Sequence, residues 1–379
     1  MQNMEEKKLG FGCMRLPLTN REDPKSIDLP QVMQMVDLFL EHGFRYFDTA
    51  YPYHGEESEH AVRRALVERY PRESFHLADK MPILRVKAAE DYPRFFEEQR
   101  KRCGVEYFDS YLLHNLGRDR YVNVQKFGAF DFLAGLKQKG YVRRIGFSYH
   151  DNAETLDRIL TDHPEVDFVQ LQINYLDWDS AVTQSAKCYA VAVKHGKPVT
   201  VMEPVKGGTL AQLPEEAQRH FDSFVQSGKG QERHMSPASL AIRYAASLDH
   251  VSMVLSGMSS MDQLKDNIDF MQEFHPLTAE ERKLAEEITE IMNRTIRVAC
   301  TGCRYCMEEC PKQINIPDYF GLLNLHAVTG KVSNMYYQRF SMNHGKASEC
   351  LSCGRCERIC PQHLSIREYL KEFSVLYSE

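Results

Sequence analysis

FRYFDTAYPYHGEESEHAVRRALVERY, residues 44–70, places a short strand-like run directly before a helix-like one. The run FRYFDTA, residues 44–50, is short and apolar, as strands of a buried sheet are. From residue 57 onward, apolar residues recur every three or four positions, as they do on one face of a helix. The stretch therefore predicts one β-strand, a polar loop and one α-helix.

The same alternation of strand-like and helix-like runs extends from residue 9 to about residue 270. Further helix-like segments cover residues 29–43 and 130–140, and each ends in a glycine where a helix C-cap belongs. The other strand candidates are residues 74–80, 107–114, 143–150, 167–175, 197–204 and 252–257. Residues 9–17 are expected to form either an eighth strand or a plug that closes the bottom of the sheet. Such alternation predicts a parallel sheet covered by helices.

The number of strands and the chain length fit an α/β fold, an eight-stranded (β/α)8 or TIM barrel, over residues 1–295. A doubly wound open sheet is the alternative. It would place G-x-G-x-x-G after the first strand, and GFGCMR at residues 10–15 lacks the third glycine. A charged helix over residues 276–298 is expected to lead into a second, smaller domain over residues 296–379.

Length and charge exclude several classes of protein. A chain of 379 residues exceeds the size of most single cores, so two domains are expected. The net charge of −6 gives no electrostatic basis for binding nucleic acid or an anionic membrane. Because no apolar run approaches the roughly 18 residues of a membrane span, and the N-terminus lacks the apolar core of a signal peptide, we expect a cytoplasmic protein.

Eight of the eleven cysteines fall in two copies of one motif, CTGCRYCMEECP at residues 300–311 and CLSCGRCERICP at residues 350–361. Each copy reads Cys-x2-Cys-x2-Cys-x3-Cys-Pro, the spacing of bacterial [4Fe–4S] ferredoxins. Zinc is the alternative, but structural zinc sites use paired Cys-x2-Cys units around one ion, so two complete copies favour iron–sulfur. The remaining cysteines, Cys13, Cys103 and Cys188, are expected to be buried as small apolar residues.

The repeat also predicts which thiols share a cluster. In two-cluster ferredoxins, the fourth cysteine of each run ligates the other cluster. One [4Fe–4S] cluster would therefore take Cys300, Cys303, Cys306 and Cys360, and the other would take Cys350, Cys353, Cys356 and Cys310. The 39 residues between Cys310 and Cys350 include the helix-like run IPDYFGLLNLHAVTG, so this module resembles the mainly α-helical ferredoxin type.

Polar residues mark the ends of several predicted strands, where a barrel of this kind gathers its catalytic groups. Asp48, Lys80, His114 and Ser148 each end a strand, and Tyr53 follows Asp48 within the next loop. Taken singly, each is as well explained by a structural hydrogen bond.

Together, these residues make the chain resemble the aldo-keto reductases over roughly residues 9–270. The motifs that fall in the family's order and spacing are LGFGCMRLP, FDTAYPYHGEESEHAVRRAL, LADK, VEYFDSYLLH, VRRIGFSYH, VQLQINY, VMEPVKGGTL and SGMSSMDQLKDN. The resemblance implies an oxidoreductase that interconverts a carbonyl and an alcohol with a nicotinamide cofactor. It implies a catalytic tetrad of Asp48, Tyr53, Lys80 and His114.

The tetrad residues suit this chemistry. Hydride reduction of a carbonyl leaves an alkoxide that must receive a proton, and Tyr53 is the expected donor. Lys80 is expected to lower the pKa of Tyr53 by stabilising the phenolate, and Asp48 is expected to keep Lys80 charged. His114 would orient the substrate oxygen by hydrogen bonding.

The resemblance also implies cofactor contacts. Ser148 and Gln172 would bind the nicotinamide carboxamide, and Met202 stands where relatives stack an aromatic residue on the nicotinamide. The loop containing Pro204, Gly207 and Gly208 would cover the pyrophosphate. Gly257, Gln263 and Asn267 lie where relatives bind the 2′-phosphate of NADP. Since Gly257 and Gln263 replace cations there, NADP and NAD both stay open as the cofactor.

Three functions follow from joining such a barrel to iron–sulfur clusters. In the first, the clusters pass electrons to or from a redox partner protein, and a flavin in the barrel or on the partner converts hydride into single electrons. In the second, the barrel is a conventional carbonyl reductase with structural clusters. In the third, the protein senses redox state. In each case a small carbonyl or alcohol is the expected substrate, and the insertion at residues 116–130 is expected to shape its pocket.

Overall fold

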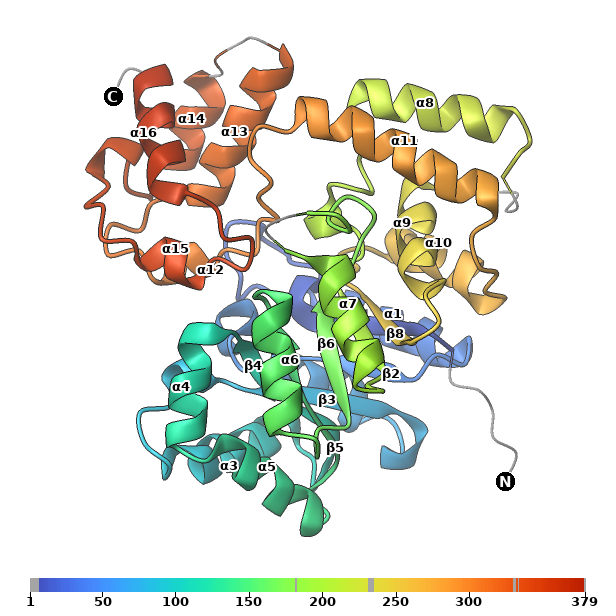
Figure 1. Ribbon diagram of the computed structural model, residues 1–379, viewed down its shortest axis with the longest axis vertical. Helices are drawn as coiled ribbons and strands as arrows, with labels where there is room; N and C mark the ends of the chain where they lie inside the picture. The colour runs from blue at the N-terminus through green and yellow to red at the C-terminus, as the bar shows by residue number, and fades with distance from the viewer. Residues whose placement is uncertain (1–6, 181–182, 231–234, 330–331, 333, 378–379) are drawn as a thin grey trace.

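A closed barrel of eight parallel strands forms the first part of the chain (Figure 1). The computed structural model describes residues 7–180, 183–230, 235–329, 332 and 334–377. The strands are β1 Leu9–Gly12, β2 Tyr46–Asp48, β3 His76–Met81, β4 Phe108–Leu116, β5 Val142–Tyr149, β6 Phe168–Gln172, β7 Val199–Met202 and β8 Val251–Ser256. Strand β1 pairs with both β2 and β8, so residues 9–12 close the barrel and are not a plug. The predicted (β/α)8 fold is confirmed.

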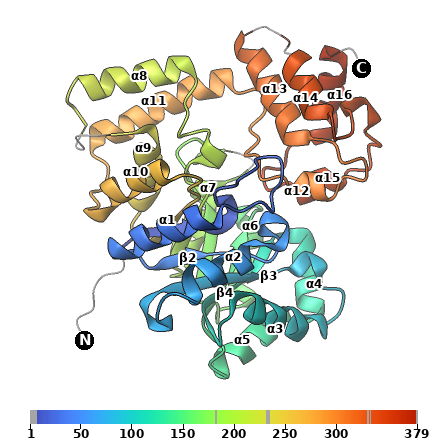
Figure 2. The same ribbon diagram turned by 180° about the vertical axis from the view of Figure 1, so that it is seen from behind.

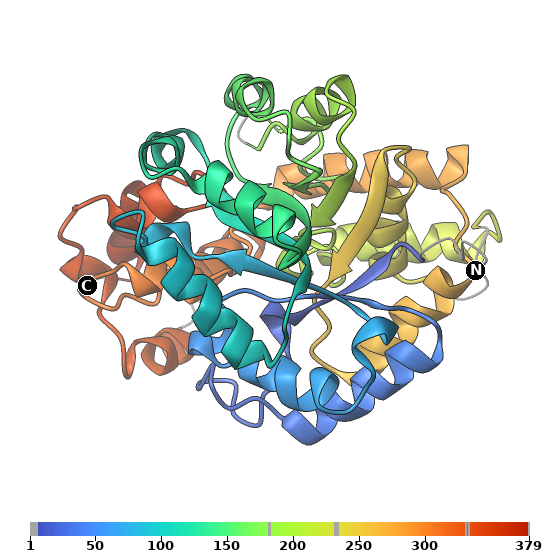
Figure 3. The ribbon, with the colours of Figure 1, turned by 90° about the horizontal axis from the view of Figure 1, so that it is seen from below.

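Helices surround these strands, as the view from below shows (Figure 3). The α-helices are α1 Leu29–Glu41, α2 Ser58–Val62, α3 Asp91–Cys103, α4 Arg118–Lys126, α5 Ala129–Gln138, α6 Ala153–Asp162, α7 Ser185–Lys194, α8 Glu215–Gln226, α9 Pro237–Ala246, α10 Met261–Gln272 and α11 Ala279–Thr295. The short helical turns are η1 Cys13–Arg15, η2 Tyr53–Glu56, η3 Arg63–Val67, η4 Arg72–Ser74, η5 Ile83–Arg85, η6 Lys206–Gly208 and η7 Ala347–Glu349. The single helix predicted after β2 is therefore α2 followed by the wider π turn η3.

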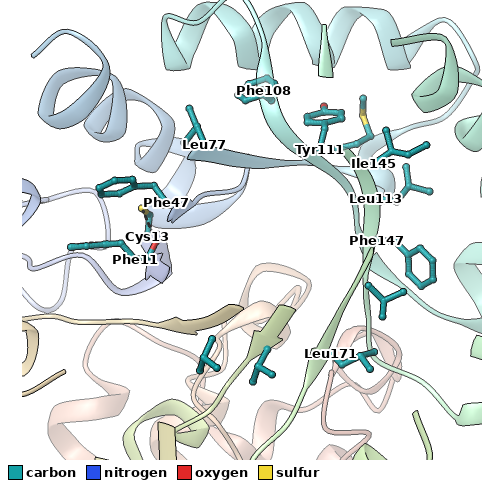
Figure 4. Close-up of a cluster of buried hydrophobic side chains, with 14 of the residues drawn as sticks. Phe11, Cys13, Phe47, Leu77, Phe108, Tyr111, Leu113, Ile145, Phe147 and Leu171 are labelled. Carbon is teal, nitrogen blue, oxygen red and sulfur yellow. Dashed lines mark hydrogen bonds between the residues drawn. The ribbon is translucent and has the colours of Figure 1, made fainter. Parts of the chain in front are cut away.

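Strand side chains alternate between the two faces of the barrel wall, as the period of two requires. Phe47 and Leu77 face the helices, and Figure 4 shows them with other members of that outer core. Their neighbours Tyr46 and Ala78 belong to a separate inner cluster that fills the barrel. The barrel is thus a packed core, and functional groups must lie at its ends.

In the described part of the chain after α11, five more helices follow, shown from orange to red in Figure 1. They are α12 Tyr305–Glu308, α13 Ile316–Thr329, α14 Asn334–Ser341, α15 Arg355–Ile359 and α16 Ile366–Leu376. Tyr319, Phe320 and Phe373 are buried in a core of their own, which confirms a mainly α-helical module. Helix α11 runs beside α8 and leads from the barrel to these helices (Figures 1 and 2). Among the described residues, no helix is both long and apolar enough to span a membrane.

Candidate active site and cysteine cavities

A cavity of about 290 Å³ lies at the C-terminal ends of the strands and is lined by both parts of the chain. It brings together most of the residues predicted to act at the active site: Asp48, Tyr53, Lys80, His114, Ser148, Met202, Pro204, Gly207, Gly208, Gly257, Gln263 and Asn267. Gln172 is not among the described residues that line the cavity. Further lining residues come from the cysteine-rich module: Thr301, Cys303, Tyr305, Pro361 and Gln362.

Lys80, at the end of β3, forms a buried ion pair with Asp48, at the end of β2. Its Nζ donates to Asp48 Oδ1 at 2.5 Å and to the carbonyl of Thr49 at 2.8 Å. Neighbouring strands bring the two side chains together, because Asp48 is opposite Ala78, two residues before Lys80. Burial raises the pKa of Asp48, and the Lys80 charge opposes that rise. The pair therefore sets an ammonium group against a carboxylate in the cavity wall.

Tyr53 lies in η2 with its ring 5.0 Å from Lys80 Nζ. Its pKa was expected to fall beside Lys80, and the structure indicates the reverse. Burial raises the pKa of Tyr53 well above 10, and the Asp48 carboxylate raises it further. Desolvation of a phenolate outweighs the attraction of the Lys80 cation, which is also paired with Asp48. Tyr53 is therefore a protonated phenol at neutral pH, the form that can donate a proton.

His114, on β4, contacts two tyrosine rings. Its ring centroid is 5.7 Å from that of Tyr53 and 6.3 Å from that of Tyr305, and both pairs are edge-on. Burial, reinforced by Lys80, lowers the pKa of His114 well below 6.5. The imidazole is therefore neutral at neutral pH, with one nitrogen able to donate and the other able to accept.

The side chain of Gln172, at the end of β6, forms hydrogen bonds with the cysteine-rich module. Its Nε2 donates to Gln362 Oε1 at 3.0 Å, and Gln362 Nε2 donates to Gln172 Oε1 at 2.8 Å. Asp177 accepts a second bond from Gln172 Nε2 and pairs with the buried Lys206. The Gln172 amide is thus satisfied by protein groups, which differs from its predicted contact with a nicotinamide.

The remaining predicted cofactor residues lie along a path from the tetrad toward the start of α10. Gly207, in η6, has a φ of +64°, and a Cβ there would lie 2.0 Å from the carbonyl oxygen of Thr301. The loop after β7 therefore fits against the first cysteine motif only with glycine at this position. At the other end, Asn267 donates to Ser256 Oγ at 2.6 Å. Backbone glycines and a helix N-terminus along one path fit a dinucleotide, which needs close approach and amide donors at its phosphates.

The insertion at residues 116–130 does not shape this cavity, contrary to expectation. None of the described residues that line the cavity comes from it. It forms α4, and Arg120 donates to the backbone carbonyl of Arg358 at 3.1 Å, so the insertion instead contacts the cysteine-rich module. The cysteine-rich module therefore supplies the part of the cavity wall that was expected from residues 116–130. No motif in the sequence signals this contact, because Tyr305 and Gln362 occupy positions that the Cys-x2-Cys-x2-Cys-x3-Cys-Pro spacing leaves unspecified.

The eight motif cysteines gather in two separate cavities. One is lined by Cys300, Cys303, Cys306 and Cys360, and the other by Cys310, Cys350, Cys353 and Cys356. Each cavity therefore combines three thiols of one motif with the fourth thiol of the other. All are free cysteines. The backbone N–H of Gly302 also points at Cys300 Sγ, 3.4 Å away. Four thiols with an amide donor fit a [4Fe–4S] cluster.

Comparisons with known proteins agree with both halves of the structure. Residues 8–290 match the aldo/keto reductase family, and residues 299–364 match a 4Fe-4S dicluster domain. A probable aldo-keto reductase from Glycine max is 30% identical over 47% of this chain, and the chain spans only half the length of that relative. An aldo-keto reductase from Mycobacterium avium is 28% identical over 61% of this chain and 72% of its own.

Solved structures show the same fold. An aldo-keto reductase from Bacillus halodurans, in its holo form, is 26% identical with a TM-score of 0.57, covering 74% of this chain and 91% of its own. An aldo/keto reductase from Klebsiella pneumoniae, solved with NADP and acetate, is 19% identical with a TM-score of 0.59, covering 75% and 95%. With a matching model over residues 8–290 and a closed eight-stranded barrel, the chain belongs to the aldo/keto reductase family and carries a C-terminal 4Fe-4S dicluster domain.

Proposed function

We propose that this NAD(P)-dependent oxidoreductase reduces a small carbonyl compound at the cavity lined by Tyr53, His114, Lys80 and Asp48. The observation that carries the proposal is that the Tyr53 phenol, the His114 imidazole and the buried Lys80–Asp48 pair line one cavity. A phenol can supply a proton, a neutral imidazole can hold the substrate oxygen, and a fixed cation can stabilise the charge that develops on it.

Each of these residues has its own role in the reaction. A nicotinamide cofactor held in this cavity would supply the hydride that the carbonyl carbon receives. Tyr53 gives its proton to the carbonyl oxygen, so the C=O bond becomes an alcohol. Lys80 stabilises the negative charge left on Tyr53 until solvent returns a proton. Asp48 holds Lys80 in place and keeps it charged. Ser148, Met202 and the loop of Pro204, Gly207 and Gly208 would hold the cofactor beside this site.

The two cysteine cavities would each hold a [4Fe–4S] cluster, which takes up and releases single electrons. Cys303, in the first cavity, also lines the active-site cavity, whereas Cys353, in the second, is exposed. The two cavities share the segments that carry Cys306–Cys310 and Cys356–Cys360. This order, from active site to surface, supports electron exchange with a partner protein. Because hydride carries two electrons, we propose that the partner bears a flavin.

A second candidate function follows from the position of the first cysteine motif, which supplies part of the wall of the active-site cavity. Arg15 Nη2 donates to the carbonyl of Thr301 at 3.1 Å, and Thr301 and Tyr305 both line the cavity. A cluster bound by Cys300, Cys303 and Cys306 would fix that wall. In this case the enzyme is a conventional carbonyl reductase with structural clusters.

One experiment separates the two functions. The protein is purified anaerobically and titrated with NADH and then NADPH, while visible and EPR spectra are recorded. Loss of the cluster absorbance with a reduced-cluster EPR signal supports electron exchange. Oxidised clusters in an enzyme that reduces a test aldehyde support the structural role. An enzyme that oxidises neither nucleotide with any aldehyde or ketone contradicts the proposed reductase.

A further inference from the structure

Tyr305 is a second phenol at the carbonyl site, and it comes from the cysteine-rich module. It lies between Cys303 and Cys306 and lines the same cavity as Tyr53 and His114. Its Oη is 3.5 Å from His114 Nε2, at the long limit of a hydrogen bond. The two phenols and the imidazole therefore line one cavity.

The cavity offers more hydrogen-bond donors than one carbonyl oxygen can accept from. That oxygen has two lone pairs, and Tyr53 and His114 are placed to use both. Tyr305 adds a third hydrogen-bonding group beside His114, whose ring is edge-on to both tyrosine rings. A ligand that displaces water from this cavity must give each polar group it covers a partner, so a ligand that fits the site offers a second oxygen next to the first.

We propose that Tyr305 is a substrate-binding residue and that the enzyme acts on carbonyl compounds bearing an oxygen on the adjacent carbon, such as α-hydroxy ketones. This inference rests on the proposed carbonyl reduction at Tyr53. In the free enzyme, Tyr305 Oη contacts His114 Nε2. When substrate binds, His114 Nε2–H turns to the carbonyl oxygen, and the Tyr305 hydroxyl bonds the adjacent oxygen. A phenol can donate to or accept from that oxygen, so a hydroxyl satisfies it.

The hydrogen bond between Tyr305 and His114 in the free enzyme is weak, so breaking it when substrate binds costs little free energy. A hydrogen bond of 3.5 Å is much weaker than one of 2.7–3.0 Å, so little is lost when Tyr305 leaves His114. Tyr305 is also fixed by its position between two cluster-ligating cysteines, which limits its freedom before substrate binds. Substrate selection would therefore depend on a residue outside the barrel.

The test compares 3-hydroxybutan-2-one with butan-2-one, which differ by one hydroxyl, in the complete anaerobically purified protein. For the unmodified enzyme we expect kcat/KM to favour the hydroxy ketone by about tenfold or more, the worth of one well-placed hydrogen bond. Tyr305→Phe should abolish that preference, because it should lower kcat/KM for 3-hydroxybutan-2-one about tenfold more than kcat/KM for butan-2-one. Tyr369→Phe, in α16 of the same module, serves as the control and should keep the preference.

The outcomes are distinguishable. If neither ketone nor any simple aldehyde is reduced, the proposed function fails. If butan-2-one is reduced but the unmodified enzyme shows no preference, or Tyr305→Phe keeps the preference, the assignment of Tyr305 is wrong while the reductase stands. Iron content and the visible spectrum of Tyr305→Phe must match those of the unmodified protein. If the variant lacks clusters, Tyr305→Trp, which removes the hydroxyl and keeps an aromatic ring, replaces it in the same comparison.

Discussion

Gln172 of the barrel and Gln362 of the cysteine-rich module bond to each other through both of their amides, with donor–acceptor distances of 3.0 and 2.8 Å. Both side chains are buried, so neither amide can turn to water when the pair is broken. Gln362 follows the cluster-site residue Cys360 by two positions, and Gln172 ends β6. The pair therefore links a strand end of the catalytic barrel to a cysteine cavity.

Removing either member of this pair should destabilise the protein by about 1–3 kcal/mol, because the other amide stays buried with a partner missing. Gln172→Ala with Gln362→Ala should cost little more than either change alone, since the pair is already broken. Denaturant unfolding measures these values, and Gln338→Ala, at an exposed position of α14, is the control. Additive losses would show that the two amides act independently.

The same variants test how Gln172 relates to the cofactor. Because Gln362 and Asp177 already satisfy its amide, Gln172→Ala should change the Kd for NADPH by less than about threefold. A fluorescence titration measures the affinity. A loss of tenfold or more would show that Gln172 exchanges Gln362 for the nicotinamide carboxamide.

Tyr53→Phe should lower kcat for carbonyl reduction by about 10²–10⁴-fold, because it removes the proton donor and keeps the ring. The buried Lys80–Asp48 pair does not depend on the phenol, so thermal stability and iron content should be unchanged. Tyr107→Phe is a matched control at the surface, where Tyr107 Oη accepts from Arg143 at 2.7 Å. A kcat within twofold of the unmodified enzyme would remove Tyr53 from the mechanism.

The rate of reduction should be nearly independent of pH between about 7 and 9. The pKa of Tyr53 lies well above 10, so its proton is lost only when the pH rises through that higher value. The pKa of His114 lies well below 6.5, so His114 gains a proton only when the pH falls through that lower value. A profile of kcat/KM against pH tests both groups. A transition near 6.5, or one between 7 and 9, would show that burial does not control these pKa values.

The barrel and the gathering of these side chains in one cavity could be predicted because their signals are local. Asp48, Lys80 and His114 each lie within two residues of a strand end, and the closed barrel brings strand ends together whatever the details of packing. The contacts of Tyr305 and Gln362 could not be predicted in this way. Tyr305 meets His114 across 191 positions, and Gln362 meets Gln172 across 190. Such contacts depend on how one module docks on another, which no periodicity or motif spacing encodes.

The pKa of Tyr53 was predicted in the wrong direction for a related reason. From the sequence, Lys80 is a nearby cation, and a cation lowers the pKa of a phenol. The structure adds the depth of burial and the Asp48 carboxylate, both of which raise it. The sum of opposing electrostatic effects needs coordinates, even where the residues involved are known.

The assignment of cysteines to clusters gives a prediction that distinguishes crossed from uncrossed ligation. If each cavity holds one cluster, Cys300 and Cys360 serve the same cluster, whereas Cys300 and Cys310, from one motif, serve different ones. The double variant Cys300→Ser/Cys360→Ser should therefore retain one cluster, about four iron atoms per chain, and Cys300→Ser/Cys310→Ser should lose both. Iron analysis and EPR of anaerobically reconstituted protein measure the difference. Ligation within each motif would give the opposite result, because Cys300 and Cys310 would then share a cluster.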